Sequence, residues 1–111
     1  MTGSKGGWTE LRSALRDLIL LALSQQDEGR IEHRDGFALS LLPGLCDLPD
    51  TPFMQGRIAP VIARMADQGL ITKRTRGNRT HEIRLAISLS EEEIDRLSQE
   101  KRANIRTARG R

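Results

Sequence analysis

The sequence predicts an α+β fold, mainly helical, and three observations carry this prediction. Apolar residues repeat at helical spacing between Thr9 and about Gln26, and again from Ile58 to Met65. Two β-prone runs, at about Leu70–Arg74 and Thr80–Ile87, flank a polar turn. A Ser-x-x-Glu motif, from Ser90 to Glu93, marks the start of a last helix. We therefore expect one domain in which helices precede and follow a β-hairpin.

The first helix is expected to begin at Thr9, which can cap its N-terminus. Leu20, Leu21 and Leu23 widen its apolar stripe until most of its sides are apolar. A helix of this kind is buried by more than one neighbour. The additional face can pack on the rest of the domain or on a second subunit, and we favour the second subunit slightly.

Short elements joined by loops are expected between the first and third helices. Arg30–His33 is expected to form an edge strand, and Gly36–Leu42 a short second helix with Phe37 facing the core. Pro43-Gly44 is expected to end that helix, because proline cannot continue the backbone ladder and glycine favours turns. Residues 45–55 then form an irregular connection.

Pro60 places the start of the third helix, because proline is tolerated in a first helical turn, where its missing N–H is not needed. We therefore expect this helix to begin near Arg57–Ala59 and to end at Gly69, a residue suited to a left-handed C-terminal position. Ile58, Val61, Ile62 and Met65 form its buried face. Its outer face is expected to carry Gln55, Arg57, Pro60, Ala63 and Arg64.

The hairpin is expected to turn at Arg76-Gly77-Asn78-Arg79, whose residue types tolerate turn geometry. The second strand alternates between two faces. We expect Ile83, Leu85 and Ile87 to face the core, and Glu82, Arg84 and Ala86 to face water.

The last helix has the clearest start signal in the chain. Ser90 and Glu93 form a capping box, and Leu89 and Ile94 are spaced as a hydrophobic staple requires. We expect the helix to fray past about Asn104. The predicted organisation is a flexible start at residues 1–8, a domain at 9–88, a C-terminal helix at 89–104 and a basic tail at 105–111.

Positive charge is clustered in the 111-residue chain, although its net charge is only +3. Residues 72–84 hold five Lys or Arg residues against one Glu, and residues 101–111 hold five with no acid. Clustered positive charge is typical of a protein that binds a polyanion. Each cluster taken alone fits a solvated face or a disordered tail equally well.

A single cysteine, Cys46, excludes an intrachain disulfide and favours a reducing cytosol. We expect Cys46 to be a small half-buried residue rather than a redox sensor. The longest apolar run, Leu18–Leu23, is far shorter than the ~18 residues that span a membrane. Residues 1–7 lack the apolar core and cleavage site of a signal peptide.

The order of helix, strand, basic turn and strand predicts a winged helix-turn-helix domain that binds DNA. Its third helix would read base edges through Gln55, Arg57 and Arg64, because arginine pairs well with guanine. The hairpin would bind backbone phosphates through Lys73, Arg74, Arg76, Asn78 and Arg79. Three alternatives stay open: a surface ion pair of Arg64 with Asp67, an ordinary loop role for Gln55, and a solvated basic hairpin.

The chain resembles the PadR and MarR groups of bacterial winged-helix regulators over about residues 11–88. The resemblance rests on Gly36-Phe37-Ala38-Leu39 at the second helix, Pro60 inside the third, and Met65–Leu70 at its end. The wing carries Asn78-Arg79 where the MarR group usually has an Asp-x-Arg pair. The 43–55 connection is longer than in either group, and the last helix is shorter than their dimerising helix.

No pattern in the sequence predicts an enzyme, a cofactor site or a metal site. The two histidines, His33 and His81, lie in separate segments, and no paired His/Cys spacing is present. Phosphate-loop and nucleophile-elbow motifs are absent. Aromatic residues make up 3% of the chain, which argues against single-strand binding by base stacking.

We therefore expect a regulator, a repressor by preference, that binds double-stranded DNA with sequence specificity in the cytoplasm, on the bacterial nucleoid. It is expected to form a homodimer through the first and last helices, with no membrane partner. Two alternatives are a winged-helix module for protein interaction or assembly, and an architectural protein that binds DNA without sequence preference.

Overall fold

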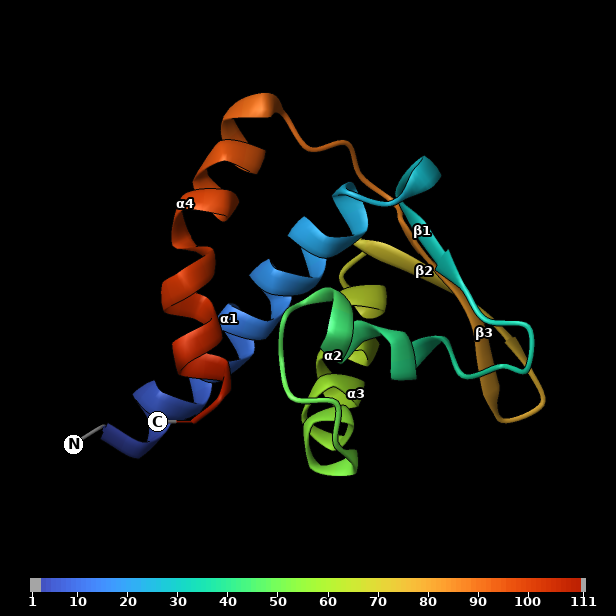
Figure 1. Cartoon of the computed structure of the whole chain (residues 1–111), viewed down its shortest axis with the longest axis horizontal. Helices are drawn as coiled ribbons and strands as arrows, with labels where there is room; N and C mark the ends of the chain where they lie inside the picture. The colour runs from blue at the N-terminus through green and yellow to red at the C-terminus, as the bar shows by residue number, and fades with distance from the viewer. Residues whose placement is uncertain (1–2, 111) are drawn as a thin grey trace.

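The structure, a computed structural model, is α+β and mainly helical, as the sequence predicts (Figure 1). It describes the backbone of residues 3–110 and the side chains of residues 9–110. Residues 1, 2 and 111, parts of the expected flexible start and basic tail, lie outside the described residues. The elements in chain order are α1 (Gly3–Ser24), a 3-10 turn (Asp27–Gly29), β1 (Arg30–Glu32), a 3-10 turn (Ala38–Leu41), α2 (Leu42–Leu45), α3 (Pro52–Asp67), β2 (Ile71–Arg76), β3 (Arg79–Leu85) and α4 (Glu91–Ala108).

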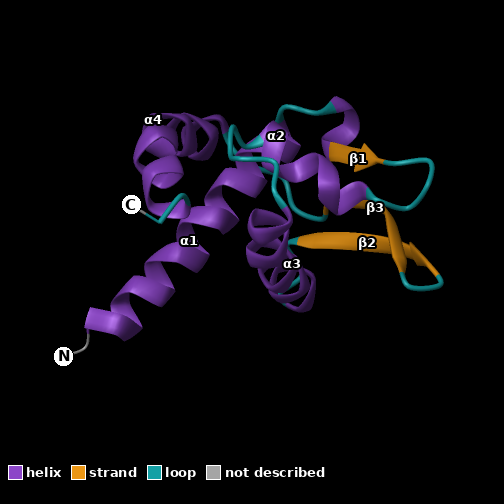
Figure 2. Cartoon of the chain, turned by 60° about the horizontal axis from the view of Figure 1, so that its bottom comes forward, coloured by secondary structure: helices purple, strands orange, loops and turns teal. Residues whose placement is uncertain are grey.

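α1 runs through the centre of the molecule, and α4 packs along it (Figures 1 and 2). The helix begins at Gly3, so the prediction of a start at Thr9 is wrong. Leu20, Leu21 and Leu23 are 8%, 2% and 0% exposed. The wide apolar surface of α1 is therefore covered by the chain itself, and our preference for a second subunit as its cover is wrong. Its apolar residues instead build the domain core together with α3, β3 and α4.

The second and third helices begin and end at other residues than predicted. Pro43 does not end the second helix; it lies in the first turn of α2, which continues the 3-10 turn. α3 begins at Pro52 rather than near residues 57–59, because Thr51 caps it: the Met54 N–H donates to Oγ1 of Thr51 at 3.1 Å. Pro60 therefore lies inside α3, where its missing N–H removes one hydrogen bond of the helix.

The three strands form an antiparallel sheet in the order β1-β3-β2. Arg30 in β1 pairs with Arg84 in β3, in agreement with the expected edge strand. The register of β2 with β3 shifts between Arg74 and Thr75, so β3 carries one extra residue there, a β-bulge. Beyond the bulge, Arg76 lies opposite Arg79 and closes the hairpin.

The predicted alternation holds from Ile83, which is 0% exposed, through exposed Arg84 and half-buried Leu85 to exposed Ala86, and fails at Ile87 and Glu82. Ile87 lies beyond the end of β3 and is 37% exposed. Glu82, expected in water, is only 5% exposed. Nη1 of Arg30 donates to a Glu82 carboxylate oxygen at 3.1 Å, and a guanidinium nitrogen of Arg84 lies 3.7 Å from the same oxygen. The carboxylate is buried because two arginines cover and neutralise it on this face of the sheet.

The capping box of α4 is confirmed. The Glu93 N–H donates to Oγ of Ser90 at 3.1 Å, and the Ser90 N–H donates to the Glu93 carboxylate at 3.4 Å. The helix does not fray at Asn104 but continues to Ala108, which is fully buried. Much of the expected basic tail is therefore helical. No helix in the described part of the chain is long and apolar enough to cross a membrane.

Candidate nucleic-acid interface

The β2–β3 hairpin and the loop that follows β1 meet at one end of the sheet (Figure 1). We call this end, residues 33–37 with residues 73–81, the basic tip. Backbone bonds join its two segments: the His33 N–H donates to the carbonyl of His81 at 2.9 Å, and Phe37 bridges to Thr80. Gly36 has φ +84°, and a Cβ there would lie 2.6 Å from Cβ of Arg79. Only glycine allows the loop to approach the hairpin this closely.

The basic tip carries five exposed cations: Arg34, Lys73, Arg74, Arg76 and Arg79. Its single acid is Asp35, whose backbone carbonyl accepts from Arg79 at 3.4 Å. Among the described residues, none of the five cations forms an ion pair with a carboxylate. The exposed side chains of the tip therefore carry an excess of positive charge, which attracts anions.

The arginines at the other end of the sheet, in contrast, are paired. Arg30 contacts three carboxylates, those of Glu28, Glu32 and Glu82, at 3.7, 2.9 and 3.1 Å. The hydrogen bond to Glu32 raises the pKa of Arg30 above its ordinary value, and burial opposes this rise. Arg84 lies 3.9 Å from Glu28 as well. Positive charge without a partner is thus confined to the tip end of this sheet.

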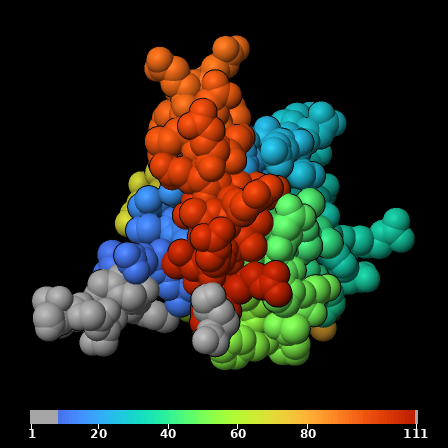
Figure 3. Space-filling view, turned by 60° about the vertical axis from the view of Figure 1, so that its left-hand side comes forward, coloured from blue at the N-terminus to red at the C-terminus, as the bar shows by residue number. Residues whose placement is uncertain are grey.

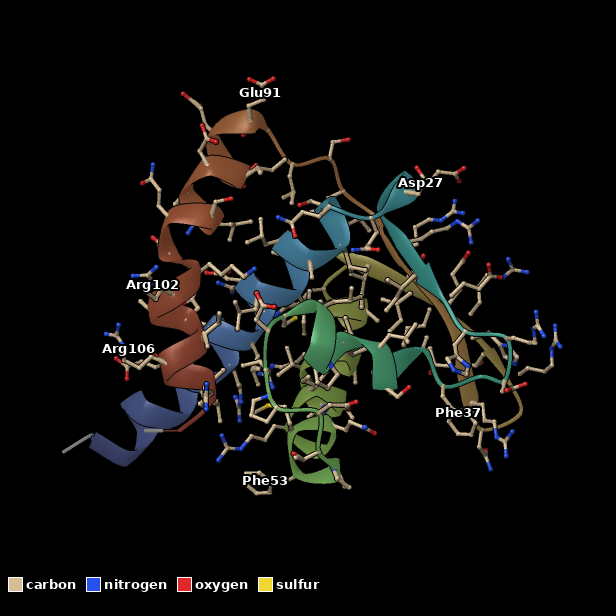
Figure 4. All side chains as sticks on the ribbon, in the orientation of Figure 1. Asp27, Phe37, Phe53, Glu91, Arg102 and Arg106 are labelled. Carbon is tan, nitrogen blue, oxygen red and sulfur yellow. The ribbon has the colours of Figure 1, made fainter. Side chains whose placement is uncertain are left out.

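Phe37 was expected in the core, but it is 47% exposed and lies at the basic tip (Figure 4). The core position is taken by Ala38, which is 0% exposed, because the 3-10 turn begins one residue after Phe37. The Arg79 guanidinium carbon lies 4.8 Å from the ring centre, above the ring. The His33 ring meets Phe37 edge to face, with centres 5.7 Å apart.

The structure brings Lys73, Arg74, Arg76, Asn78 and Arg79 together at the basic tip, all exposed, as the sequence analysis expects. Sequence reasoning missed the loop residues that join them, Arg34 and Phe37. The available signal was a glycine, Gly36, with a cation two positions before it and an aromatic residue directly after it, close to the end of an edge strand. Arg34, Arg76, Asn78, Arg79 and His81, with Asp35, line an open depression of ≈ 460 Å³.

The three residues proposed to read bases from α3 have different surroundings. Arg57 is half-buried: its Nη1 donates to the carbonyl of Ala108 at 2.9 Å, and its guanidinium lies 4.5 Å from the Phe53 ring centre. This arginine joins the end of α4 to the start of α3. Gln55 is half-buried, and its side-chain amide lies 3.4 Å from Asp50. Arg64 is exposed and forms no ion pair with Asp67.

The exposed positions in the middle of α3 include three small residues, Gly56, Ala59 and Ala63. Small side chains let a helix approach a partner closely, but they offer no hydrogen bonds to base edges. Among the three residues proposed to read bases, Arg64 is the one whose side chain forms no hydrogen bond or ion pair in the described structure. The exposed middle of α3 therefore offers few side chains that could form hydrogen bonds with a partner.

A second group of cations lies on α4. Arg102 and Arg106 lie on the side of the helix that faces away from the sheet (Figure 4). With Arg109, Pro49 and Ile105 they line a shallow hollow of ≈ 580 Å³. In the space-filling view the end of α4 (red) lies beside the segment before α3 (green) (Figure 3). Lys101 is not part of this free charge, since its ammonium lies 2.7 Å from Asp47.

The described residues include no group of three or more His, Cys, Asp or Glu that could hold a metal ion. Cys46 is 1% exposed, and burial raises the pKa of its thiol to about 12. A thiol with this pKa stays protonated and is a poor nucleophile near neutral pH.

Comparison of this chain with protein-family models, with curated proteins and with solved structures found no match.

Proposed function

We propose that this chain is a winged-helix protein that binds double-stranded DNA and regulates transcription on the bacterial nucleoid. The element order α1, β1, α2, α3, β2, β3 supports the winged-helix assignment, with α3 as the reading helix and the β2–β3 hairpin as the wing. The observation that carries the proposal is the basic tip, where five exposed cations lack carboxylate partners in the described structure. Such a surface binds phosphates and releases their counterions.

Most of the affinity in this proposal comes from phosphate contacts at the tip. The small outward residues of α3 leave Arg64 as the main side chain for base recognition, so sequence preference is modest. A repressor with palindromic half-sites also requires a homodimer. Because the apolar surface of α1 is already covered, such a dimer would use the outward face of α4.

A second candidate is an architectural protein that binds DNA without sequence preference. The small outward residues of α3 favour it, since they contact a groove without reading bases. The cations on α4 favour it as well, because they offer a second phosphate surface. Selection of bound sequences from random duplexes separates the two: a regulator enriches a motif, and an architectural protein enriches none.

Fluorescence anisotropy with a labelled duplex at low salt tests the DNA-binding proposal. We expect the double variant Arg76→Ala/Arg79→Ala to lose most of its affinity, because two phosphate contacts disappear. The matched comparison, Arg102→Ala/Arg106→Ala, removes the same charge from α4 and should cost clearly less affinity than the tip variant. Equal affinity of the tip variant and the wild-type chain contradicts the proposal, as does a wild-type chain that binds no duplex.

A larger loss of DNA affinity in the α4 variant than in the tip variant would indicate that α4 forms the DNA-binding surface. That outcome contradicts the tip as the DNA-binding surface.

A further inference from the structure

We propose that Phe37 inserts against a base step of the bound DNA, so that the basic tip prefers duplexes in which a base is already unstacked. This inference rests on the proposed function and deepens it. It assigns to the tip a contact with bases that sequence-independent phosphate binding does not supply.

The first argument is the position of Phe37. Three large hydrophobic residues are notably exposed in the described structure: Phe37, Phe53 and Ile87. Phe37 is the one that lies among the five cations of the tip, none of which pairs with a carboxylate in the described structure. Exposed aromatic rings next to unpaired arginines are typical of surfaces that contact both phosphates and bases.

The second argument is that the ring is held in place before any ligand binds. Arg79 covers one face of the ring, and the edge-to-face contact with His33 fixes its orientation. The glycine at position 36 and the bridge to Thr80 hold the loop against the hairpin. Little conformational freedom is then lost on binding, which favours affinity.

The third argument is chemical. Proteins that bind the minor groove insert apolar wedges, phenylalanine among them, between base steps and partly unstack the bases. Arg34 and Arg76 line the open depression beside Phe37 and can hold the sugar-phosphate backbone on either side of the opened step. Unstacking is least costly at a mismatched or damaged base. A preference for mismatched duplexes is the measurable consequence.

The experiment compares two short duplexes of the same sequence, one fully paired and one with a single central mismatch, each carrying 2-aminopurine beside the central position. We expect the wild-type chain to bind the mismatched duplex about tenfold more tightly, in the range of one base–aromatic stack. The 2-aminopurine fluorescence should rise on binding, because the neighbouring base unstacks.

Phe37→Ala should reduce the preference to less than about twofold, and should lower affinity for the paired duplex by at most about threefold, because the phosphate contacts stay. Phe37→Trp should restore the preference and the fluorescence change. The matched control is Phe53→Ala, which removes the other exposed phenylalanine that lies under an arginine and should leave both readouts unchanged. If Phe37 only supported its loop, affinity for both duplexes would fall together.

The inference is overturned if Phe37→Ala keeps the mismatch preference, or if the wild-type chain has none. Both results are distinct from failure of the proposed function. A wild-type chain that binds neither duplex refutes DNA binding itself, and with it the inference. A chain that binds paired DNA through Arg76 and Arg79, yet ignores the mismatch, refutes only the role of Phe37.

Discussion

Replacement of Arg57 by alanine should destabilise the protein without weakening the grip of the hairpin on DNA. Arg57 donates a hydrogen bond of 2.9 Å to the carbonyl of Ala108 in the last turn of α4. It also lies over the Phe53 ring at 4.5 Å. Since carbonyls in the last turn of a helix lack backbone donors, this arginine satisfies a group that water would otherwise have to solvate.

The magnitude follows from these contacts. A hydrogen bond that involves a charged group contributes about 1.5–3 kcal/mol, a cation at a helix C-terminus about 0.3–1 kcal/mol, and an exposed cation–π contact about 0.5–1 kcal/mol. These contributions overlap, and Arg57 is only half-buried, so water replaces part of each one. We expect a loss of about 2 kcal/mol, which lowers Tm by about 8 °C for a domain of this size.

Thermal unfolding followed by circular dichroism, with calorimetry alongside, measures this change. Arg57→Lys should recover about half of the loss, because the charge stays but the planar fork is absent. Arg64→Ala is the matched control on the same helix and should change stability by less than about 0.5 kcal/mol. An unchanged Tm for Arg57→Ala, together with a large loss of DNA affinity, would refute the reasoning and restore Arg57 as a base reader.

Three further outcomes are expected. Ser90→Ala should remove the cap of α4 and lower the free energy of unfolding by about 1 kcal/mol, measured by urea denaturation; no change would contradict the capping box. Arg76→Ala/Arg79→Ala should reduce the magnitude of the log–log salt dependence of DNA binding by about 2, or about 0.9 per lost phosphate contact, and an unchanged slope would place these residues away from phosphates. Burial raises the pKa of Cys46 from 9.0 to about 12, so the free energy of unfolding should fall as pH rises through that window. Cys46→Ala should lack this component, which has a slope of up to about 1.4 kcal/mol per pH unit, and parallel profiles of the two proteins would contradict the shift.

Local signals predicted the parts of the fold that depend on neighbours in sequence. The capping box at Ser90 requires only residues three positions apart, and the structure contains it. The buried face of α3, including Ile58 and Met65, follows from helical spacing alone. The five exposed polar residues of the hairpin were found in the same way, because a turn that must face water was rich in arginine.

Other features depended on partners distant in sequence. Glu82 is buried because Arg30, 52 residues away, reaches its carboxylate. Phe37 leaves the core because its loop docks on the hairpin, which no local pattern encodes. The predicted start of α3 near Arg57–Ala59 is wrong because it rested on Pro60 alone, whereas Thr51 caps the helix and places Pro52 in its first turn. Arg57 was predicted to lie on the outer face at the start of the helix, whereas the helix begins five residues earlier and Arg57 contacts the end of α4.

The closing pair of the hairpin has a consequence for the free protein. Arg76 and Arg79 lie directly opposite each other, and like charges at such positions repel. Dissolved salt screens this repulsion. Rising ionic strength should therefore stabilise the strand pairing at the tip of the unbound hairpin and slow the hydrogen exchange of its backbone amides. The same salt competes with the protein for phosphates and weakens the complex. Rising ionic strength should therefore make the hairpin tip of the unbound protein more rigid while it lowers the affinity for DNA. In the complex, a bound phosphate supplies the negative charge that balances these two arginines.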